Sequence, residues 1–253
     1  MPTITAVTDE AILGAADRFF RQPDIASCLS ILTARLPLSA DIYVAGGAIR
    51  NIVMDSIHGS APPTADIDMF IGGLDRGFSL SEALKGEQFE PTDLKGIRWH
   101  PEASDLVFDL CLLTDFLVID AYHLDPTVEN FLSGIDFTCN AILYGIPGRE
   151  LLEKGCTEAV ARRLIEFNSR LIPDEGLIAY RILLLAHKTG FCLSKSVFRF
   201  VKDRLPLETL IHIKELLRAK MGKTVASAVM GKYDALCRYP SYAAYCADQA
   251  GNP

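Results

Sequence analysis

The sequence predicts an α+β protein, in which a mixed sheet with flanking helices is followed by an all-helical part. Two observations predict this class. Short β-prone runs alternate with helical patterns up to about residue 156, and only helical patterns with short breaks follow. No long linker or low-complexity segment separates the two parts. We therefore expect two closely packed domains, over residues 1–156 and 157–253.

The elements of the first part follow from apolar periodicity and from helix breakers. AILGAADRFF and DIASCLSILTARL predict helices, and the second ends before Pro37. DIYVA predicts a strand, and GGAIRNIVMDSI a helix that the Gly/Ser/Pro/Thr-rich loop 58–65 stops. ADIDMFI alternates like a half-buried strand. SLSEALKG and LDPTVENFLSG predict short helices, and DLVFDLCLL, FLVIDAYHL and DFTCNAILYGI predict further strands.

Five helical patterns make up the second part. They are EAVARRLIEF, DEGLIAYRILLLAHKTGF, SKSVFRFVKDRL, ETLIHIKELLRAKMG and DALCRYPSYAAYC.

Composition and charge narrow the class of protein. The 253 residues are 49% hydrophobic and 23% charged, which is typical of globular proteins. The absence of a long apolar run and of a basic, then apolar N-terminus predicts no membrane partner and no signal peptide. Seven scattered cysteines without a CxxC pair predict reduced thiols and a cytoplasmic protein.

The net charge of −7 argues against broad nonspecific binding of nucleic acids. The charge is uneven, however, because residues 195–223 hold eight lysines and arginines against three acids. This stretch predicts either a solvated helix face or a local surface for RNA.

The run ADIDMFI places two acids where a strand would present them together. Side chains at i and i+2 of a strand project from one face, so Asp66 and Asp68 lie side by side. Two such carboxylates repel each other unless a cation lies between them, and Mg²⁺ is often held by paired carboxylates and substrate phosphates. Upstream, Gly46 and Gly47 open a helix whose N-terminus can face an anion, with Arg50 in its first turn.

Together, AGGAIRN and ADIDMFI resemble the signature of the class II nucleotidyltransferases, GGxxRD, a helix, a loop and DxD. This family comprises the head domain of bacterial poly(A) polymerases and CCA-adding tRNA nucleotidyltransferases. GIDFTCNAI at 134–142 is similar to the family's RRDFTINA segment, and DEGLIAYRILLLAHKTGF at 174–191 resembles its EDPLRILRAVRFAAKLGF helix. The resemblance runs from about residue 41 to 191 in the family's order. It implies the mixed sheet of the DNA polymerase β-like nucleotidyltransferases.

The resemblance implies a metal and nucleotide site. In the family, a hydroxyl attacks the α-phosphate of a nucleoside triphosphate, pyrophosphate leaves, and two Mg²⁺ ions stabilise the attacking and leaving oxygens. Asp66 and Asp68 match the metal-binding pair. The nucleotide-binding positions match Gly46, Gly47, Arg50, Asp136, Asn140, Glu175 and Arg181, with Lys188 a further phosphate candidate.

A third carboxylate is expected on a neighbouring strand, where it would help to bind the catalytic metal. Asp109 in LVFDLCLL is favoured, because it lies in the strand expected between DxD and DFT. Asp120 in FLVIDAYH has the same local pattern, and Asp105 is a weaker alternative.

The chain also departs from the family pattern. Asn51 replaces the aspartate of GGxxRD, and Ser133-Gly134-Ile135 replaces the arginines before DFT. Ile178 stands where the EDxxR arginine reads the base, which should relax discrimination between bases. The loop before DxD is long, and about sixty residues follow the last motif, fewer than the tRNA-binding domains of full-length CCA-adding enzymes need.

Three functions stay open at this point. The first is a minimal nucleotidyltransferase that adds nucleotides, ATP among the candidates, to an RNA or tRNA 3′ end, with residues 195–223 contacting phosphates. The second is transfer to a protein or small-molecule hydroxyl, which the acidic net charge favours. The third is an inactive nucleotide-binding module, which Asn51, Ile135 and Ile178 favour and the intact Asp66 and Asp68 oppose.

Overall fold

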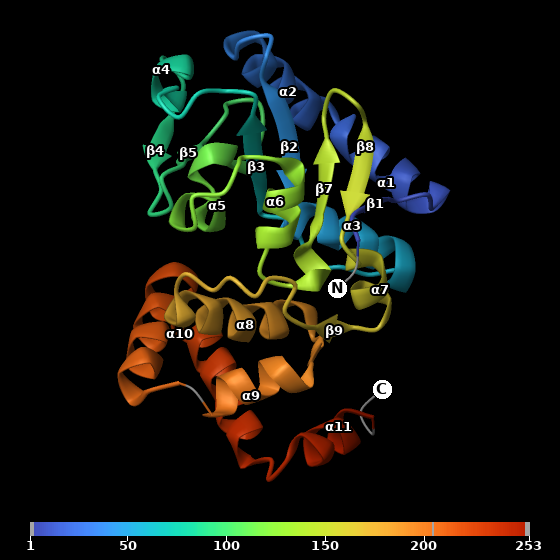
Figure 1. Ribbon diagram of the computed structural model, residues 1–253, viewed down its shortest axis with the longest axis vertical. Coiled ribbons are helices and arrows are strands. Elements are labelled where there is room, and N and C mark those ends of the chain that lie inside the picture. Colours follow the sequence, from blue (N-terminus) through green and yellow to red (C-terminus); the bar gives the residue numbers. More distant parts are fainter. Residues whose placement is uncertain (1–2, 204, 251–253) are drawn as a thin grey trace.

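In a computed structural model that describes residues 3–203 and 205–250, an α/β half lies against a smaller helical half (Figure 1). An eight-stranded sheet of order β1-β8-β7-β2-β3-β6-β5-β4 forms the centre of the α/β half. The pair β3–β6 is parallel and the other neighbours are antiparallel, so the sheet is mixed, as predicted. The strands are β1 (Thr5–Ala6), β2 (Asp41–Ala45), β3 (Asp66–Gly72), β4 (Phe89–Pro91), β5 (Ile97–Trp99), β6 (Val107–Leu112), β7 (Ile142–Gly145) and β8 (Glu150–Glu153).

Helices cover both faces of this sheet. The helices of one face include α1 and α3, whereas α5 and α6 cover part of the other face (Figure 1). The helices of the α/β half are α1 (Glu10–Phe20), α2 (Pro23–Arg35), α3 (Gly47–His58), α4 (Leu80–Ala83), α5 (Leu117–Ala121), α6 (Val128–Gly134) and α7 (Cys156–Ala161), with the 3-10 turns η1 (Leu113–Asp115) and η2 (Thr138–Asn140).

The second half is helical, as predicted, apart from one short parallel pair, β9 (Leu164–Ile165) with β10 (Cys192–Leu193). Its helices are α8 (Glu175–Thr189), α9 (Lys195–Asp203), α10 (Leu207–Arg238) and α11 (Tyr242–Ala250). The long α10 is two helices that meet at Gly222, whose φ of 82° no helix accommodates. A division at residue 156 would fall at the start of α7, which packs on α3, and it stays a prediction.

Most predicted elements form where expected, and three differ. FLVIDAYHL is not a strand, because Val118 and Ile119 lie in α5 and are both buried, Val118 beside Gly134 of α6 and Ile119 in the apolar cluster that α6 shares with the sheet. The local preference of β-branched residues for strands is overridden by this packing. DFTCNAILYGI becomes a strand only from Ile142, after η2, and EAVARRLIEF ends its helix at Ala161. The short strands β1, β4, β5, β8, β9 and β10 had no predicted counterpart.

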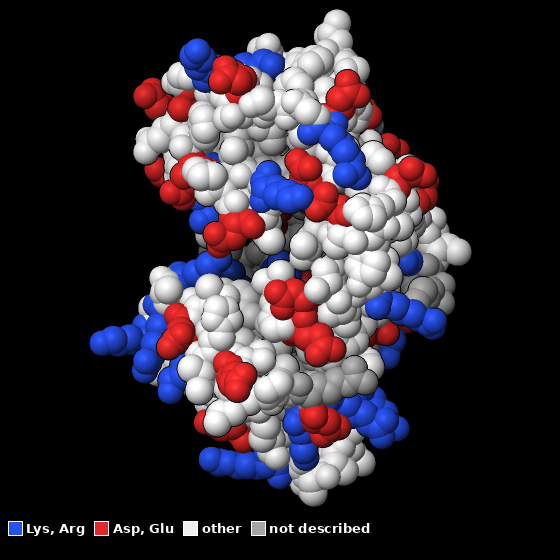
Figure 2. All heavy atoms as spheres, turned by 60° about the vertical axis from the view of Figure 1, so that its left-hand side comes forward, with Lys and Arg blue, Asp and Glu red and all other residues white. Residues whose placement is uncertain are grey.

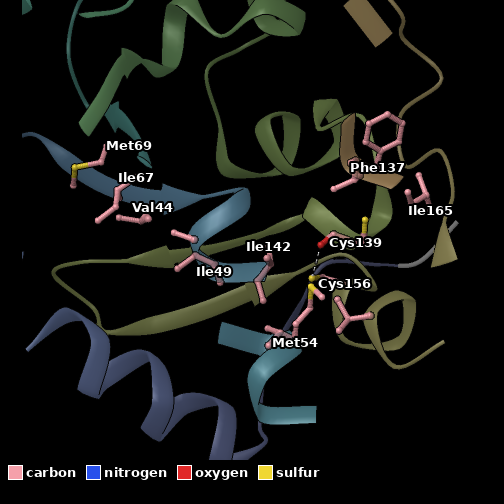
Figure 3. Packing of buried hydrophobic residues seen from close by; sticks show 14 of the residues in the cluster. Val44, Ile49, Met54, Ile67, Met69, Phe137, Cys139, Ile142, Cys156 and Ile165 are labelled. Atoms are coloured by element: carbon pink, nitrogen blue, oxygen red, sulfur yellow. Dashed lines mark hydrogen bonds between the residues drawn. The ribbon is translucent and has the colours of Figure 1, made fainter. Parts of the chain in front are cut away.

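Strand β3 shows why two acids can lie inside an apolar sheet. Ile67 and Met69 point into the larger core with Val44 and Ile49 (Figure 3), and burial of each such side chain contributes about 1.5–3 kcal/mol. The alternate positions face the other side of the sheet, where Phe70 packs on Phe116 and Phe131. This aromatic cover ends at Phe70. Asp66 is therefore exposed and Asp68 only partly covered.

Candidate active site

Backbone pairing puts three of the polar residues of the site in one row across the sheet. Ala45 of β2 pairs with Asp68 of β3, Asp68 pairs with Asp109 of β6, and Asp109 pairs with Arg98 of β5. Paired residues of neighbouring strands present their side chains on the same face, about 5 Å apart. The parallel β3–β6 pair thus brings Asp109, and not Asp105 or Asp120, beside the DxD aspartates.

Asp68 is the most perturbed carboxyl group of this row. Its removal from water, and to a lesser extent the negative charge of Asp66, raise its pKa to about 6. Arg181 and Arg50 act in the opposite direction and Asp109 in the same direction as Asp66. A desolvated carboxylate among other carboxylates gains most from a cation bound nearby.

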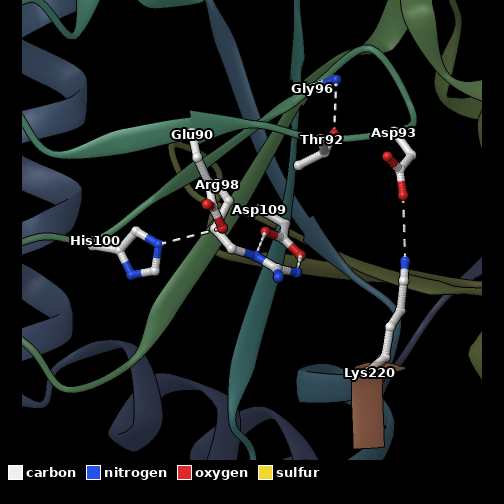
Figure 4. Close-up of polar contacts among 8 residues, drawn as sticks. All are labelled: Glu90, Thr92, Asp93, Gly96, Arg98, His100, Asp109 and Lys220. Atoms are coloured by element: carbon white, nitrogen blue, oxygen red, sulfur yellow. Dashed lines mark hydrogen bonds and ion pairs between the residues drawn. The ribbon is translucent and has the colours of Figure 1, made fainter. Parts of the chain in front are cut away.

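Asp109 is held by an arginine that the sequence interpretation missed. Arg98 donates from Nε to Oδ1 at 2.8 Å and from Nη2 to Oδ2 at 2.7 Å, so both carboxylate oxygens are engaged (Figure 4). In the described part of the chain, no group of three or more His, Cys, Asp and Glu side chains is arranged to hold a metal ion. The triad of Asp66, Asp68 and Asp109 therefore shares a face without converging, and its metal-binding role stays a prediction.

No sequence signal identified Arg98. It lies in the short run IRW, and its relation to Asp109 depends on the register of the β5–β6 pair. Only knowledge of that register would have revealed the contact.

The double glycine forms a tight turn from β2 into α3 directly beside Asp68. Gly46 adopts φ 70° and ψ −131°, a conformation that side chains other than glycine rarely adopt. A Cβ atom on Gly46 would also lie 3.0 Å from Oδ2 of Asp68. The turn therefore needs glycine for its backbone and for the close approach of the carboxylate, and it leaves the N-terminus of α3 open toward the site.

Arg50 is buried beneath this turn. Its Nη1 donates to Oδ1 of Asn140 at 2.7 Å and its Nη2 to Oδ1 of Asn51 at 3.0 Å, while Nε has no partner. Burial lowers the pKa of this guanidinium. Because Asn51 stands where the family pattern has an aspartate, the hydrogen-bond partners of Arg50 are two neutral amides. No carboxylate accepts a hydrogen bond from it among the described residues, and its role in binding an anion stays a prediction.

Arg181 joins the helical half to this site. From α8 its Nε donates to Oδ2 of Asp136, whose side chain is 8% exposed. The charge of Asp136 raises the pKa of Arg181, and Arg181 in turn is one of the charges that lower the pKa of Asp68. Arg50 and Arg181, one from each half of the molecule, are therefore close enough for their charges to act on Asp68, and Asn140 and Asp136 are their hydrogen-bond partners.

Two further positions on α8, Glu175 and Ile178, differ in their exposure to solvent. Glu175 is the exposed first residue of α8, after the capping residue Asp174, whose carboxylate accepts from the amide of Leu177 at 2.9 Å. Ile178, in place of the base-reading arginine, is 7% exposed and belongs to the core. The pair that would read a base is thus reduced to one exposed acid.

Three of the weaker candidates lie elsewhere. Asp120 is on α5 and binds Nζ of Lys95 at 2.7 Å, while Asp105 is an exposed residue before β6. Lys188 lines a separate cavity of about 240 Å³ with His58, at the far end of α3. A helix of 12 residues is about 18 Å long, so this cavity is distant from the turn at Gly46.

The basic stretch 195–223 forms α9 and the first part of α10, with Arg204 outside the described residues. Basic side chains gather on the helical half beside a hollow between the two halves (Figure 2). Lys220 reaches across to Asp93 of the β4–β5 turn at 3.5 Å (Figure 4). No helix of the described chain is both long and apolar enough to cross a bilayer.

Comparisons with known proteins bear on the fold. No protein-family model and no curated protein sequence matches the chain. A CCA-adding enzyme in complex with ATP aligns with a TM-score of 0.61 over 92% of this chain and 56% of that chain, at 18% identity. The same comparison with a CTP complex gives a TM-score of 0.60, with 93% and 56% covered, at 18% identity.

The Thermotoga maritima CCA-adding enzyme complexed with tRNA aligns with a TM-score of 0.57 over 92% of this chain and 55% of that chain, at 17% identity. The chain thus spans little more than half the length of these enzymes. The three alignments nevertheless cover more than nine-tenths of this chain. The fold of this chain is therefore that of the CCA-adding enzymes.

Proposed function

We propose that this protein is a metal-dependent nucleotidyltransferase that transfers a nucleoside monophosphate from a nucleoside triphosphate to a hydroxyl group and releases pyrophosphate. The observation that carries the proposal is the set of residues gathered near Asp68. The Gly46 turn, the buried Arg50 and the interdomain Arg181 all lie around one desolvated carboxylate, with Asp66 and Asp109 on the same face.

The donor set fits Mg²⁺. Asp66 and Asp68 offer hard oxygen ligands, and burial with the neighbouring charge of Asp66 makes the ionised form of Asp68 unfavourable without a cation. We assign two Mg²⁺ ions to Asp66, Asp68 and Asp109. Bound there, they would stabilise the charge that develops on the attacking and leaving oxygens.

The chain's own residues would bind and orient the triphosphate. The amides at the start of α3 and the guanidinium of Arg50 suit phosphate oxygens, and Arg50 is kept in place by Asn140. Arg181, held by Asp136, would bind from the helical half and so close the site around the nucleotide. Glu175 stays the proposed contact to the base, without the arginine that would make the choice of base strict.

The acceptor that we favour is an RNA 3′ end of tRNA type. The basic side chains beside the hollow between the halves would contact phosphates, and such binding weakens steeply with salt. The net charge of −7 instead favours a protein or small-molecule hydroxyl as the alternative acceptor. The seven free cysteines suit a reducing compartment, and we place the reaction in the cytoplasm.

The proposal is tested with purified protein, Mg²⁺, total RNA and each of four α-labelled nucleoside triphosphates. We expect labelled RNA with the wild type, none with Asp66→Asn/Asp68→Asn, and a large loss with Asp109→Asn. The matched control is Asp120→Asn, which changes an aspartate outside the row and should keep full activity.

If no RNA is labelled, the same assay is repeated with protein and small-molecule acceptors. Stabilisation by nucleotide and Mg²⁺ without any product would favour the inactive binding module. Equal labelling by the double variant would overturn the assignment of Asp66 and Asp68.

A further inference from the structure

Arg98 donates hydrogen bonds to both carboxylate oxygens of Asp109, and these are the atoms with which Asp109 would bind a metal ion. Nε and Nη2 of Arg98 reach the two oxygens of Asp109 at 2.8 and 2.7 Å, a bidentate geometry. Such paired, charge-assisted hydrogen bonds are among the stronger polar contacts in proteins. A divalent cation that binds Asp109 in the usual way would need the same lone pairs.

The surroundings keep Arg98 charged and in place. The hydrogen bonds with Asp109 raise the pKa of Arg98 most, and the charges of Asp66 and Glu90 raise it further. The Arg98 side chain is 41% exposed, however, against 22% for Asp109. The guanidinium can therefore swing into solvent without leaving a cavity, whereas Asp109 stays in the row beside Asp68.

We propose that Arg98 competes with a divalent cation for Asp109 and so controls when the third carboxylate becomes a metal ligand. This rests on the proposed function, because it concerns the metal site of that reaction. Without nucleotide, Arg98 holds Asp109, and only Asp66 and Asp68 are free to bind a cation. A bound triphosphate offers Arg98 other anionic oxygens, which lets it leave Asp109 while keeping a partner.

The test measures Mn²⁺ binding to the full chain without nucleotide, by electron paramagnetic resonance of free Mn²⁺. We expect Arg98→Gln to bind Mn²⁺ about tenfold or more tightly than the wild type, because one bidentate competitor and one positive charge are removed. Arg98→Lys keeps the charge but not the fork of donors, and should lie between the two. Adding Asp109→Asn to Arg98→Gln should cancel the gain.

The matched control is Arg149→Gln, which breaks an ion pair of similar exposure with Asp17, also at 2.7 Å, and should leave Mn²⁺ affinity unchanged. Circular dichroism melts establish that each variant is folded. Unchanged or weaker Mn²⁺ binding by both Arg98 variants would overturn the proposal, the weaker result meaning that Arg98 orients Asp109 for the metal.

Nucleotide transfer is measured separately, so that the two proposals fail independently. If Arg98→Gln gains Mn²⁺ affinity while the wild type transfers no nucleotide to any acceptor, the competition stands and the proposed function fails. If the wild type transfers nucleotide and Arg98→Gln gains nothing, only the competition fails.

Discussion

At the residue scale, Asp68 is the carboxylate of the candidate site whose ionised form has the least favourable environment. It is desolvated, it shares a face with two other carboxylates, and the Gly46 turn approaches its Oδ2 closely. Native proteins seldom keep such a group without a compensating ligand. This unfavourable environment is the physical reason for the proposed affinity of the site for cations.

The pH dependence of stability follows from this residue. The pKa of Asp68 rises from 3.8 to about 6 on folding, so between these values the folded chain holds a proton that the unfolded chain releases. Stability is therefore present at low pH and is lost as pH rises through this window, by up to about 3 kcal/mol in the metal-free protein. Asp68→Asn should lack this loss in urea unfolding with EDTA at about pH 4 and pH 7.5.

Addition of Mg²⁺ to the wild type at the higher pH should restore stability, and should do much less for Asp68→Asn. Identical pH slopes for the two proteins in EDTA would contradict the prediction.

How far the sequence predicts the site depends on how local each contact is. Asp66 and Asp68 share a face because of strand geometry alone, and Gly46 is signalled by its position at a strand-to-helix turn. Arg98 was missed because its contact arises from register between two strands, which no local pattern specifies.

At the element scale, the packing of α5 and α6 sets the point on strand β3 at which the aromatic cover of the sheet ends. Phe116 and Phe131 enclose Phe70, with the Phe70 and Phe131 ring centroids 4.4 Å apart, and Asp68 is the next residue along that face. The sequence predicted α6 but took the α5 segment for a strand, because Val118 and Ile119 satisfy both patterns. Only the tertiary packing decides between them.

Truncation of this aromatic cover should affect stability and site together. Phe131 is 1% exposed, so Phe131→Ala should lower the free energy of unfolding by about 3–5 kcal/mol. Because Phe70 loses its main partner, Mn²⁺ affinity should fall as well. The control Tyr122→Ala removes an aromatic side chain that is 41% exposed, and should change stability by about 0.5 kcal/mol or less. Urea unfolding and Mn²⁺ titration measure the two effects, and a stability loss below that of the control would refute the role of the cover.

At the scale of the whole molecule, the pair of Asp136 and Arg181 connects the two halves at the site. The Asp136 carboxylate is 8% exposed and the Arg181 side chain 45%, so solvent partly screens the attraction. The sequence predicted both residues from family motifs, but their mutual contact required the relative placement of the halves. The proposed nucleotide site would be complete only when the halves are docked.

Removal of this link should be measurable as a coupling energy. Arg181→Ala should cost about 1–3 kcal/mol, because it leaves the Asp136 charge partly buried without its partner. In a double-mutant cycle with Asp136→Asn the two losses should not add. The comparison variant Arg162→Ala breaks the exposed pair with Glu158 and should cost about 0.5 kcal/mol or less. Strict additivity of Arg181→Ala and Asp136→Asn would rule out the coupling.

The parallel pairing of β3 with β6 has a kinetic consequence. Asp68 and Asp109 lie about 40 residues apart along the chain and meet only when this non-local pair forms. Their mutual repulsion favours an order in which local hairpins form first and this strand pair forms late. A cation bound between them together with a triphosphate would then stabilise a contact that the folding transition state lacks, and so slow unfolding without accelerating folding. Divalent cations with a triphosphate would lengthen the lifetime of the native chain more than they would hasten its formation.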